Sequence, residues 1–138
     1  MEKLESNYIT KLFNLENKVA AVIGGGGYLC SEMAKGFARA GCKVAVIDLR
    51  KEKADRVADE IKLEGYSRPL SLALDVSKKE EHKACLKEIL SEFGDLDILI
   101  NGAGINGTSP FFEISLEEWN SVLDSQITGT FLGCQVFG

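Results

Sequence analysis

Four consecutive glycines, Gly24 to Gly27, directly follow the apolar run 19–23. Glycine has no Cβ atom, so the backbone N–H groups of such a turn and the N-terminus of a following helix can closely approach a phosphate. Asp48 comes 24 residues after Gly24, at the end of a second apolar run. A carboxylate at that point can accept hydrogen bonds from ribose hydroxyls. This order predicts a dinucleotide-binding βαβ unit.

A second group of polar and small residues follows the apolar run 96–100, and it reads Asn101-Gly102-Ala103-Gly104. Asp75 similarly ends the short run 70–74. In a Rossmann sheet of strand order 3-2-1-4, the first and fourth strands flank the switch point, and ligands bind at the carboxyl ends. We therefore expect the two glycine-containing turns to line one crevice from opposite sides.

Two other phosphate- or nucleotide-binding classes compete with this interpretation. A P-loop is excluded because no Gly-Lys-Ser/Thr follows the glycines, so the phosphate-binding lysine and the magnesium-binding hydroxyl are both missing. A methyltransferase-like Rossmann domain can also use a glycine turn and an acid after the second strand. The Asn101 segment argues against it, but it stays an alternative.

A length of 138 residues predicts a single domain. With the motifs above, we expect a dinucleotide-binding domain over residues 1–138, in which 1–17 form an N-terminal extension. The net charge of −5 makes nucleic acid an unfavourable partner, and no apolar stretch is long enough to span a bilayer. Four widely spaced cysteines and one histidine offer no metal-ligand pattern. We expect a soluble, cytoplasmic protein with reduced thiols and no metal.

Helical periodicity separates the expected strands. The residues Leu29, Met33 and Phe37 predict a helix over about 29–40, with Gly41 as its C-cap, before a buried strand over 42–48. A stripe of apolar residues at helical spacing predicts a second helix that ends at Gly65, and it consists of Ala54, Val57, Ala58 and Ile61. The range 70–74 is the expected third strand.

Two capping boxes, Ser77 to Glu80 and Ser115 to Glu118, predict the starts of the last two helices. The fourth strand, 96–100, lies between them. The expected inward-facing residues are Leu86, Ile89, Leu90 and Phe93 in the first helix and Trp119, Val122, Leu123 and Ile127 in the second. Strands alternating with helices predict an α/β fold with a doubly wound parallel sheet, truncated after the fourth strand and its following helix.

These motifs resemble the N-terminal half of the short-chain dehydrogenase/reductase family, over about residues 13–137. That family has a T-G-x-x-x-G-x-G turn, and here Gly24 matches its first glycine while Tyr28 and Cys30 replace the later two. A branch similar to D-mannonate or fructuronate oxidoreductases has a G-G-G-G-x-L-C turn and N-G-A-G, as this chain does. The resemblance implies a polyol or sugar-acid substrate.

The resemblance also implies cofactor contacts. Backbone from Gly24 to Leu29 would hold the pyrophosphate, Asp48 the ribose diol, and Asp75 and Val76 the adenine. The implied cofactor-binding set is Gly24, Gly25, Gly26, Gly27, Tyr28, Leu29, Asp48, Leu49, Asp75, Val76, Asn101, Gly102, Ala103 and Gly104. Asp48 favours NAD over NADP because a carboxylate repels a 2′-phosphate, although Arg50 and Lys51 could clamp one.

The family's catalytic residues are an Asn on the helix after the fourth strand, a Ser, and a Tyr-x-x-x-Lys. Gln126 stands at the Asn position and is the candidate catalytic residue, while none of Tyr8, Tyr28 and Tyr66 is followed by the lysine. His82 is interpreted as a solvated residue. The prediction is the cofactor-binding half of an NAD-dependent oxidoreductase acting on an alcohol or carbonyl. The alternative is a non-catalytic dinucleotide-binding module or sensor.

A sheet that ends at its fourth strand leaves 96–100 with an unpaired edge, which invites association. Without partner helices, the last helix would also expose Ile127, Phe131, Leu132 and Phe137. We expect a homo-oligomer through this helix, marginal stability, or aggregation.

Overall fold

Four parallel strands form one sheet in the order β3-β2-β1-β4 in a computed structural model that describes residues 6–138. The strands are β1 (Val19–Ile23), β2 (Lys43–Asp48), β3 (Leu70–Ala73) and β4 (Ile98–Asn101). The pairing is parallel throughout, with Ala21 opposite both Ala45 and Leu99. This order confirms the predicted Rossmann sheet, in which β4 is an edge strand. Residues 1–5, part of the expected N-terminal extension, lie outside the described residues.

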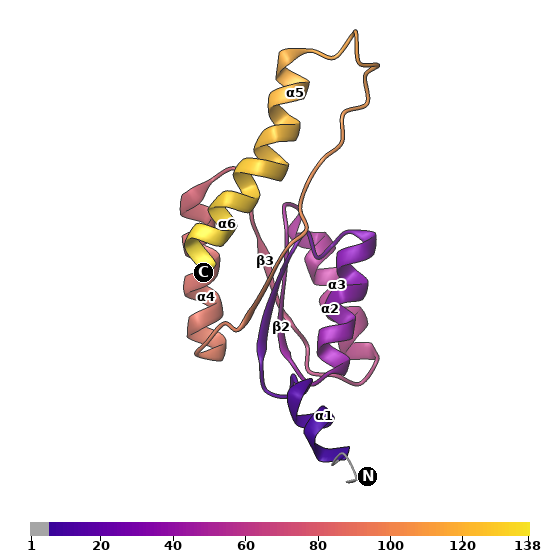
Figure 1. Ribbon diagram of the computed structural model, residues 1–138, viewed down its shortest axis with the longest axis vertical. Coiled ribbons are helices and arrows are strands. Elements are labelled where there is room, and N and C mark those ends of the chain that lie inside the picture. The colour runs from indigo at the N-terminus through magenta and orange to yellow at the C-terminus, as the bar shows by residue number, and fades with distance from the viewer. Residues whose placement is uncertain (1–5) are drawn as a thin grey trace, which may run out of the picture.

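Six helices accompany the sheet in the described residues 6–138, and four of them cover its two faces. The six helices are α1 (Ser6–Leu12), α2 (Tyr28–Arg39), α3 (Lys51–Leu63), α4 (Lys79–Phe93), α5 (Leu116–Leu123) and α6 (Gly129–Phe137), with a π-helical segment η1 (Asp124–Thr128) between the last two. The helices α2 and α3 pack on one face, and α4 and α6 on the other (Figure 1). The helix α5 and the loop before it extend beyond the sheet (Figure 1).

The core lies on both sides of β1 and β2. Along β1, Val19, Ala21 and Ile23 join the cluster beneath α4, whereas Val22 joins the cluster beneath α2 and α3. This alternation follows from the two-residue period of a strand, and apolar residues on both faces make a continuous apolar run. The α3 residues Ala54, Val57, Ala58 and Ile61 are fully buried, which confirms the predicted stripe. Gly41 has φ +86°, as the predicted C-cap requires.

The start and inner face of α4 differ from the prediction. The N-cap is Lys78 without a side-chain cap, because the Ser77 hydroxyl and N–H both donate to the Asp75 carboxylate instead. The buried face contains His82, Cys85 and Ile89, while Leu90 is exposed. The interpretation of His82 as solvated is therefore wrong. The helix is turned so that His82 lies under the end of α6, where it contacts Phe137.

The last helical stretch is also positioned differently. The Ser115 cap is confirmed, since its hydroxyl accepts from the Glu118 N–H at 3.1 Å. The predicted inward orientation of Trp119 and Ile127 is wrong, because both are exposed where this stretch passes beyond the sheet. Ile127 and Phe131 are exposed as the oligomer hypothesis requires, but Leu132 is buried because α6 packs against β4 and α4.

Candidate cofactor site

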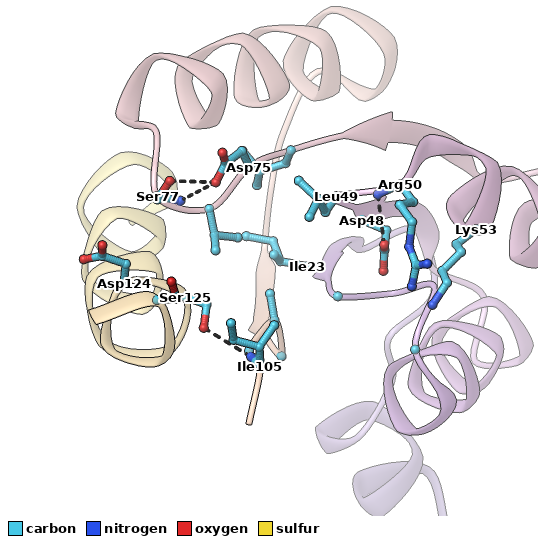
Figure 2. A pocket seen from close by; sticks show the side chains of 18 residues that line it. Ile23, Asp48, Leu49, Arg50, Lys53, Asp75, Ser77, Ile105, Asp124 and Ser125 are labelled. Carbon is cyan, nitrogen blue, oxygen red and sulfur yellow. Dashed lines mark hydrogen bonds between the residues drawn. The ribbon is translucent and has the colours of Figure 1, made fainter. Parts of the chain in front are cut away.

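A cavity of about 500 Å³ lies at the carboxyl ends of the strands (Figure 2). Its walls come from the turns after all four strands and from the α5–η1 stretch. The lining residues are Ile23, Gly24, Gly27, Asp48, Leu49, Arg50, Lys53, Leu74, Asp75, Val76, Ser77, Gly102, Ala103, Gly104, Ile105, Ser121, Asp124 and Ser125. The two glycine-containing turns line this one cavity, as the strand order predicted.

The turn after β1 approaches the turn after β4 so closely that a side chain has no room. Gly24 has φ +78°, and a Cβ atom built on it would lie 2.8 Å from the backbone of Gly102 and Ala103. The N–H of Gly27 donates to the Gly24 carbonyl at 2.9 Å, which closes the turn. Gly27 is also the N-cap of α2 and gives no side-chain cap. The positive end of the α2 dipole therefore lies at a bare backbone surface beside the cavity.

Asp48 is held in place at the end of β2. One carboxylate oxygen accepts from the N–H of Gly26 at 3.1 Å, and the other accepts from the N–H of Arg50 at 3.1 Å. Arg50 and Lys53 line the same end of the cavity, beside Asp48 (Figure 2). This end therefore combines one immobilised carboxylate with two cationic side chains.

The turn after β3 forms the neighbouring wall. The Asp75 carboxylate accepts from the Ser77 hydroxyl at 2.7 Å and from the Ser77 N–H at 3.1 Å. These hydrogen bonds, the hydroxyl first, hold the pKa of the Asp75 carboxyl below its usual value. The Asp75 N–H donates to Glu81 in α4 at 2.7 Å. The turn is therefore tied to the helix that follows it.

The wall opposite Asp48 was missed by sequence reasoning. It contains Ser121, Asp124 and Ser125 (Figure 2 labels the last two), and the Ser125 hydroxyl accepts from the Ile105 N–H at 3.2 Å. Polar residues at i, i+3 and i+4 on a helix share one face, and this spacing was the available signal. The other lining residues not predicted are Ile23, Lys53, Leu74, Ser77 and Ile105.

Six of the predicted site residues do not line the cavity. Gly25 and Gly26 lie behind Gly24 and contact β2, with Gly25 donating to the Ile47 carbonyl at 2.9 Å. Tyr28 and Leu29 are in the first turn of α2 with their side chains 94% and 66% exposed. The remaining two are Asn101 and Gln126.

Asn101 and Gln126 form bonds that hold the surrounding backbone. The Asn101 side chain lies against Gly133 of α6 and donates to the Cys134 sulfur at 3.5 Å, so it ties β4 to α6. The Gln126 amide in η1 donates to the Ile105 carbonyl at 2.7 Å. Because Ile105 lines the cavity, Gln126 contacts the site through the backbone of that residue.

Residues 6–138 contain neither a metal-binding cluster nor a membrane-spanning helix. No cluster of three His, Cys, Asp or Glu side chains arranged to hold a metal ion occurs there. No helix in the same range has the length and apolarity needed to cross a membrane.

Comparison with known proteins identifies one matching family model, that of the short chain dehydrogenases, over residues 18–137. D-threitol dehydrogenase of Mycolicibacterium smegmatis is 35% identical over 128 residues, which are 91% of this chain and 48% of that protein. The oxidoreductase UxuB of Bacillus subtilis is 37% identical over 141 residues, covering 91% of this chain and 50% of its own. The chain thus spans about half the length of these relatives.

Solved structures give the same match. A 3-ketoacyl-(acyl-carrier-protein) reductase from Brucella melitensis, complexed with NADH, superposes with a TM-score of 0.81 at 36% identity, over 88% of this chain and 48% of its own. A short-chain type dehydrogenase/reductase from Mycobacterium marinum gives a TM-score of 0.87 at 30% identity, over 93% of this chain and 50% of its own.

Proposed function

The chain belongs to the short-chain dehydrogenase family, and we propose that it binds NAD for an oxidoreductase that interconverts an alcohol and a carbonyl. The observation that carries this proposal is the cavity between the Gly24 and Gly102 turns, which has the Asp48 carboxylate at one end. A bound nicotinamide dinucleotide would supply the hydride chemistry. The activity of the whole protein is part of the proposal.

The cavity fits such a cofactor in two ways. The missing Cβ atom at Gly24 and the uncapped N-terminus of α2 leave N–H groups for a pyrophosphate. The Asp48 carboxylate has lone pairs beyond those used by Gly26 and Arg50, and these can accept from a ribose diol. In this proposal Asp75 and Val76 bind the adenine. The backbone from Gly102 to Gly104 supports the nicotinamide ribose, and the Asn101 side chain anchors that segment to α6.

NAD is proposed over NADP because Asp48 is fixed by two backbone hydrogen bonds. It cannot turn away from a 2′-phosphate without breaking them. Arg50 and Lys53 lie beside it and would attract the same phosphate. The expected preference is therefore for NADH, with measurable binding of NADPH.

Calorimetric titration with NADH, NADPH and S-adenosylmethionine tests the proposal. We expect NADH to bind more tightly than NADPH, and S-adenosylmethionine to give no heat. Absence of NADH binding at millimolar concentration would refute the function. Binding of S-adenosylmethionine alone would instead favour the methyltransferase alternative.

For the substrate we propose a polyol or sugar acid. The glycine turn with Leu29 and Cys30 supports this class, and so does the polyol named in D-threitol dehydrogenase. We further propose Gln126 as the amide at the family's Asn position. Its bond to the Ile105 carbonyl supports a role in shaping the cavity wall. Assays of the whole protein with NAD and a polyol panel test this, and NADH binding without any turnover would favour the non-catalytic module.

We also propose a homo-oligomer formed through the last helical stretch, η1 and α6, and a cytoplasmic location. The exposed side chains of Ile127 and Phe131 support the first. The four cysteines are widely spaced in the sequence and form no Cys-x-x-Cys pair, which supports the second.

A further inference from the structure

His82 is a polar side chain in an otherwise apolar position. It lies in α4 with no exposed surface, on the same helix face as Cys85 and Ile89. Its Nε2 atom is 2.9 Å from the Val76 carbonyl oxygen. A carbonyl can only accept, so Nε2 must carry the proton.

The other ring nitrogen, Nδ1, is buried and has no hydrogen-bond partner among the described residues. A proton on Nδ1 would be a buried donor without an acceptor, which is costly. The contact with Val76 therefore selects the neutral Nε2–H tautomer. Phe137 covers the ring edge-on, with the ring centroids 5.9 Å apart, and encloses it further.

Val76, the partner of His82, lines the cavity and is restrained on two sides. Its carbonyl accepts from His82, and its side chain packs against Gly129 of α6. A Cβ atom built on Gly129 would lie only 2.8 Å from the Val76 side chain. By contrast, the backbone N–H of Val76 has no partner within residues 6–138. The two peptide units that meet at the Val76 Cα thus differ, because the carbonyl of the second is bonded and the N–H of the first is available to a ligand.

An apolar side chain at position 82 would avoid burying an unpaired nitrogen, so core packing alone does not favour a histidine there. What the histidine adds is a directional bond to a residue of the cavity wall. We propose that His82 is a positioning residue: by holding the Val76 carbonyl it restrains the Val76 Cα, and with it the N–H of the preceding peptide unit, which is presented to the adenine of the cofactor. This inference rests on the proposed NAD-binding function.

A matched pair of variants, His82→Gln and His82→Met, separates positioning from packing. The two side chains have nearly the same length, but only glutamine can donate to the Val76 carbonyl. We expect ADP and NADH to bind His82→Gln within about twofold of the unaltered chain. Loss of one hydrogen bond predicts about fivefold weaker binding to His82→Met. The melting temperatures of the two variants should not follow the order of their cofactor affinities. We expect His82→Met to melt no lower than His82→Gln, because methionine is the better buried residue.

Long-range ¹H–¹⁵N spectra of the imidazole add a readout that packing would not change. His82 is the one histidine among the 138 residues, so its ring signals are identified directly. We expect a protonated Nε2 and a bare Nδ1. Relative to the unaltered chain, the chemical shift of the Val76 amide should change in His82→Met and stay nearly the same in His82→Gln.

The outcomes distinguish this inference from the function on which it rests. If the unaltered chain binds no NADH, the proposed function fails and the inference fails with it. If it binds NADH and His82→Met binds ADP equally well, only the role of His82 is refuted. A protonated Nδ1 with a bare Nε2 would also refute that role.

Discussion

The thiol of Cys30 in α2 occupies the space beside Gly102 in which a Cβ atom would otherwise lie. The sulfur is 3.9 Å from the Gly102 carbonyl oxygen. Burial raises the pKa of this thiol, with the charge of Asp48 as a smaller cause. The family pattern that this chain resembles has T-G-x-x-x-G-x-G after the first strand and N-N-A-G after the fourth, which would give a glycine at position 30 and an asparagine at position 102. The larger residue at position 30 therefore fills the space that the smaller residue at position 102 leaves open.

This relationship predicts a non-additive double-mutant cycle. Gly102→Asn should lower the free energy of unfolding, because its side chain meets the Cys30 sulfur. Adding Cys30→Gly should recover about 1 kcal/mol or more of that loss, as expected for residues in direct contact. Urea unfolding of the two single variants and the double variant measures the coupling. Additive losses would show that the two sites are independent.

Gly24→Ala is expected to destabilise the chain. The φ angle of +78° and the backbone of Gly102 and Ala103 at 2.8 Å both oppose a Cβ atom. The backbone strain alone costs about 1–3 kcal/mol. Gly36→Ala is the matched control, since it lies within α2 with nothing near its Cβ position, and it should stabilise by about 0.5–1 kcal/mol. Thermal unfolding measures the stability of both variants. Equal changes in stability for Gly24→Ala and Gly36→Ala would contradict the special role of Gly24.

Asp48→Asn should weaken NADH binding about tenfold and bring the affinities for NADH and NADPH closer together. Hydrogen bonds to a charged group contribute about 1.5–3 kcal/mol, and the variant removes the charge while keeping one oxygen. Calorimetric titration of both cofactors provides the measurement. Asp59→Asn, on α3 and outside the cavity lining, removes the same charge and should leave both affinities unchanged. If Asp48→Asn leaves the ratio of the NADH and NADPH affinities unchanged, Asp48 does not discriminate between the two cofactors.

Glu118 predicts pH dependence in the loop before α5. Its carboxylate accepts from Ser109 and Thr108, and these bonds, Ser109 first, lower its pKa to about 2 from the ordinary value of 4.5. A lowered folded-state pKa stabilises the loop above pH 4.5, and this contribution is lost as the pH falls toward 2. Amide exchange at Thr108 and Ser109 should therefore lose protection as acid is added.

Glu118→Gln should show weak protection of these amides already at neutral pH, with little further change on acidification. Glu117→Gln is the control, because the Glu117 carboxylate makes no hydrogen bond to this loop. Protection that persists in Glu118→Gln would mean that other contacts order the loop.

Charged substitutions on α6 test the proposed oligomer. Phe131→Glu should shift the sedimentation coefficient toward that of a monomer, because Phe131 is 59% exposed and a buried glutamate would be costly at an interface. Leu63→Lys, at the end of α3 on the opposite face, is the control and should leave sedimentation unchanged. A monomeric unaltered chain would contradict the proposal directly.

Local sequence predicted the parts that depend on near neighbours. The run Val19–Ile23 is short, apolar on both faces and followed by glycines, which favours a buried strand that ends in a tight turn at Gly24. Asp48 was expected beside the cavity because strand order brings the carboxyl ends of strands to one edge. These features require only chain order and the strand and helix periods.

Tertiary packing alone decided the rest. The periodicity of α4 allowed several faces to point inward, and contact with α6 selected the one that buries His82. Asn101 is polar and follows a strand, yet the small residue Gly133 lets its side chain turn to α6 and away from the cavity. Such outcomes depend on residues more than thirty positions apart in the chain. No local pattern encodes them, because burial is determined by what the fold brings against a side chain.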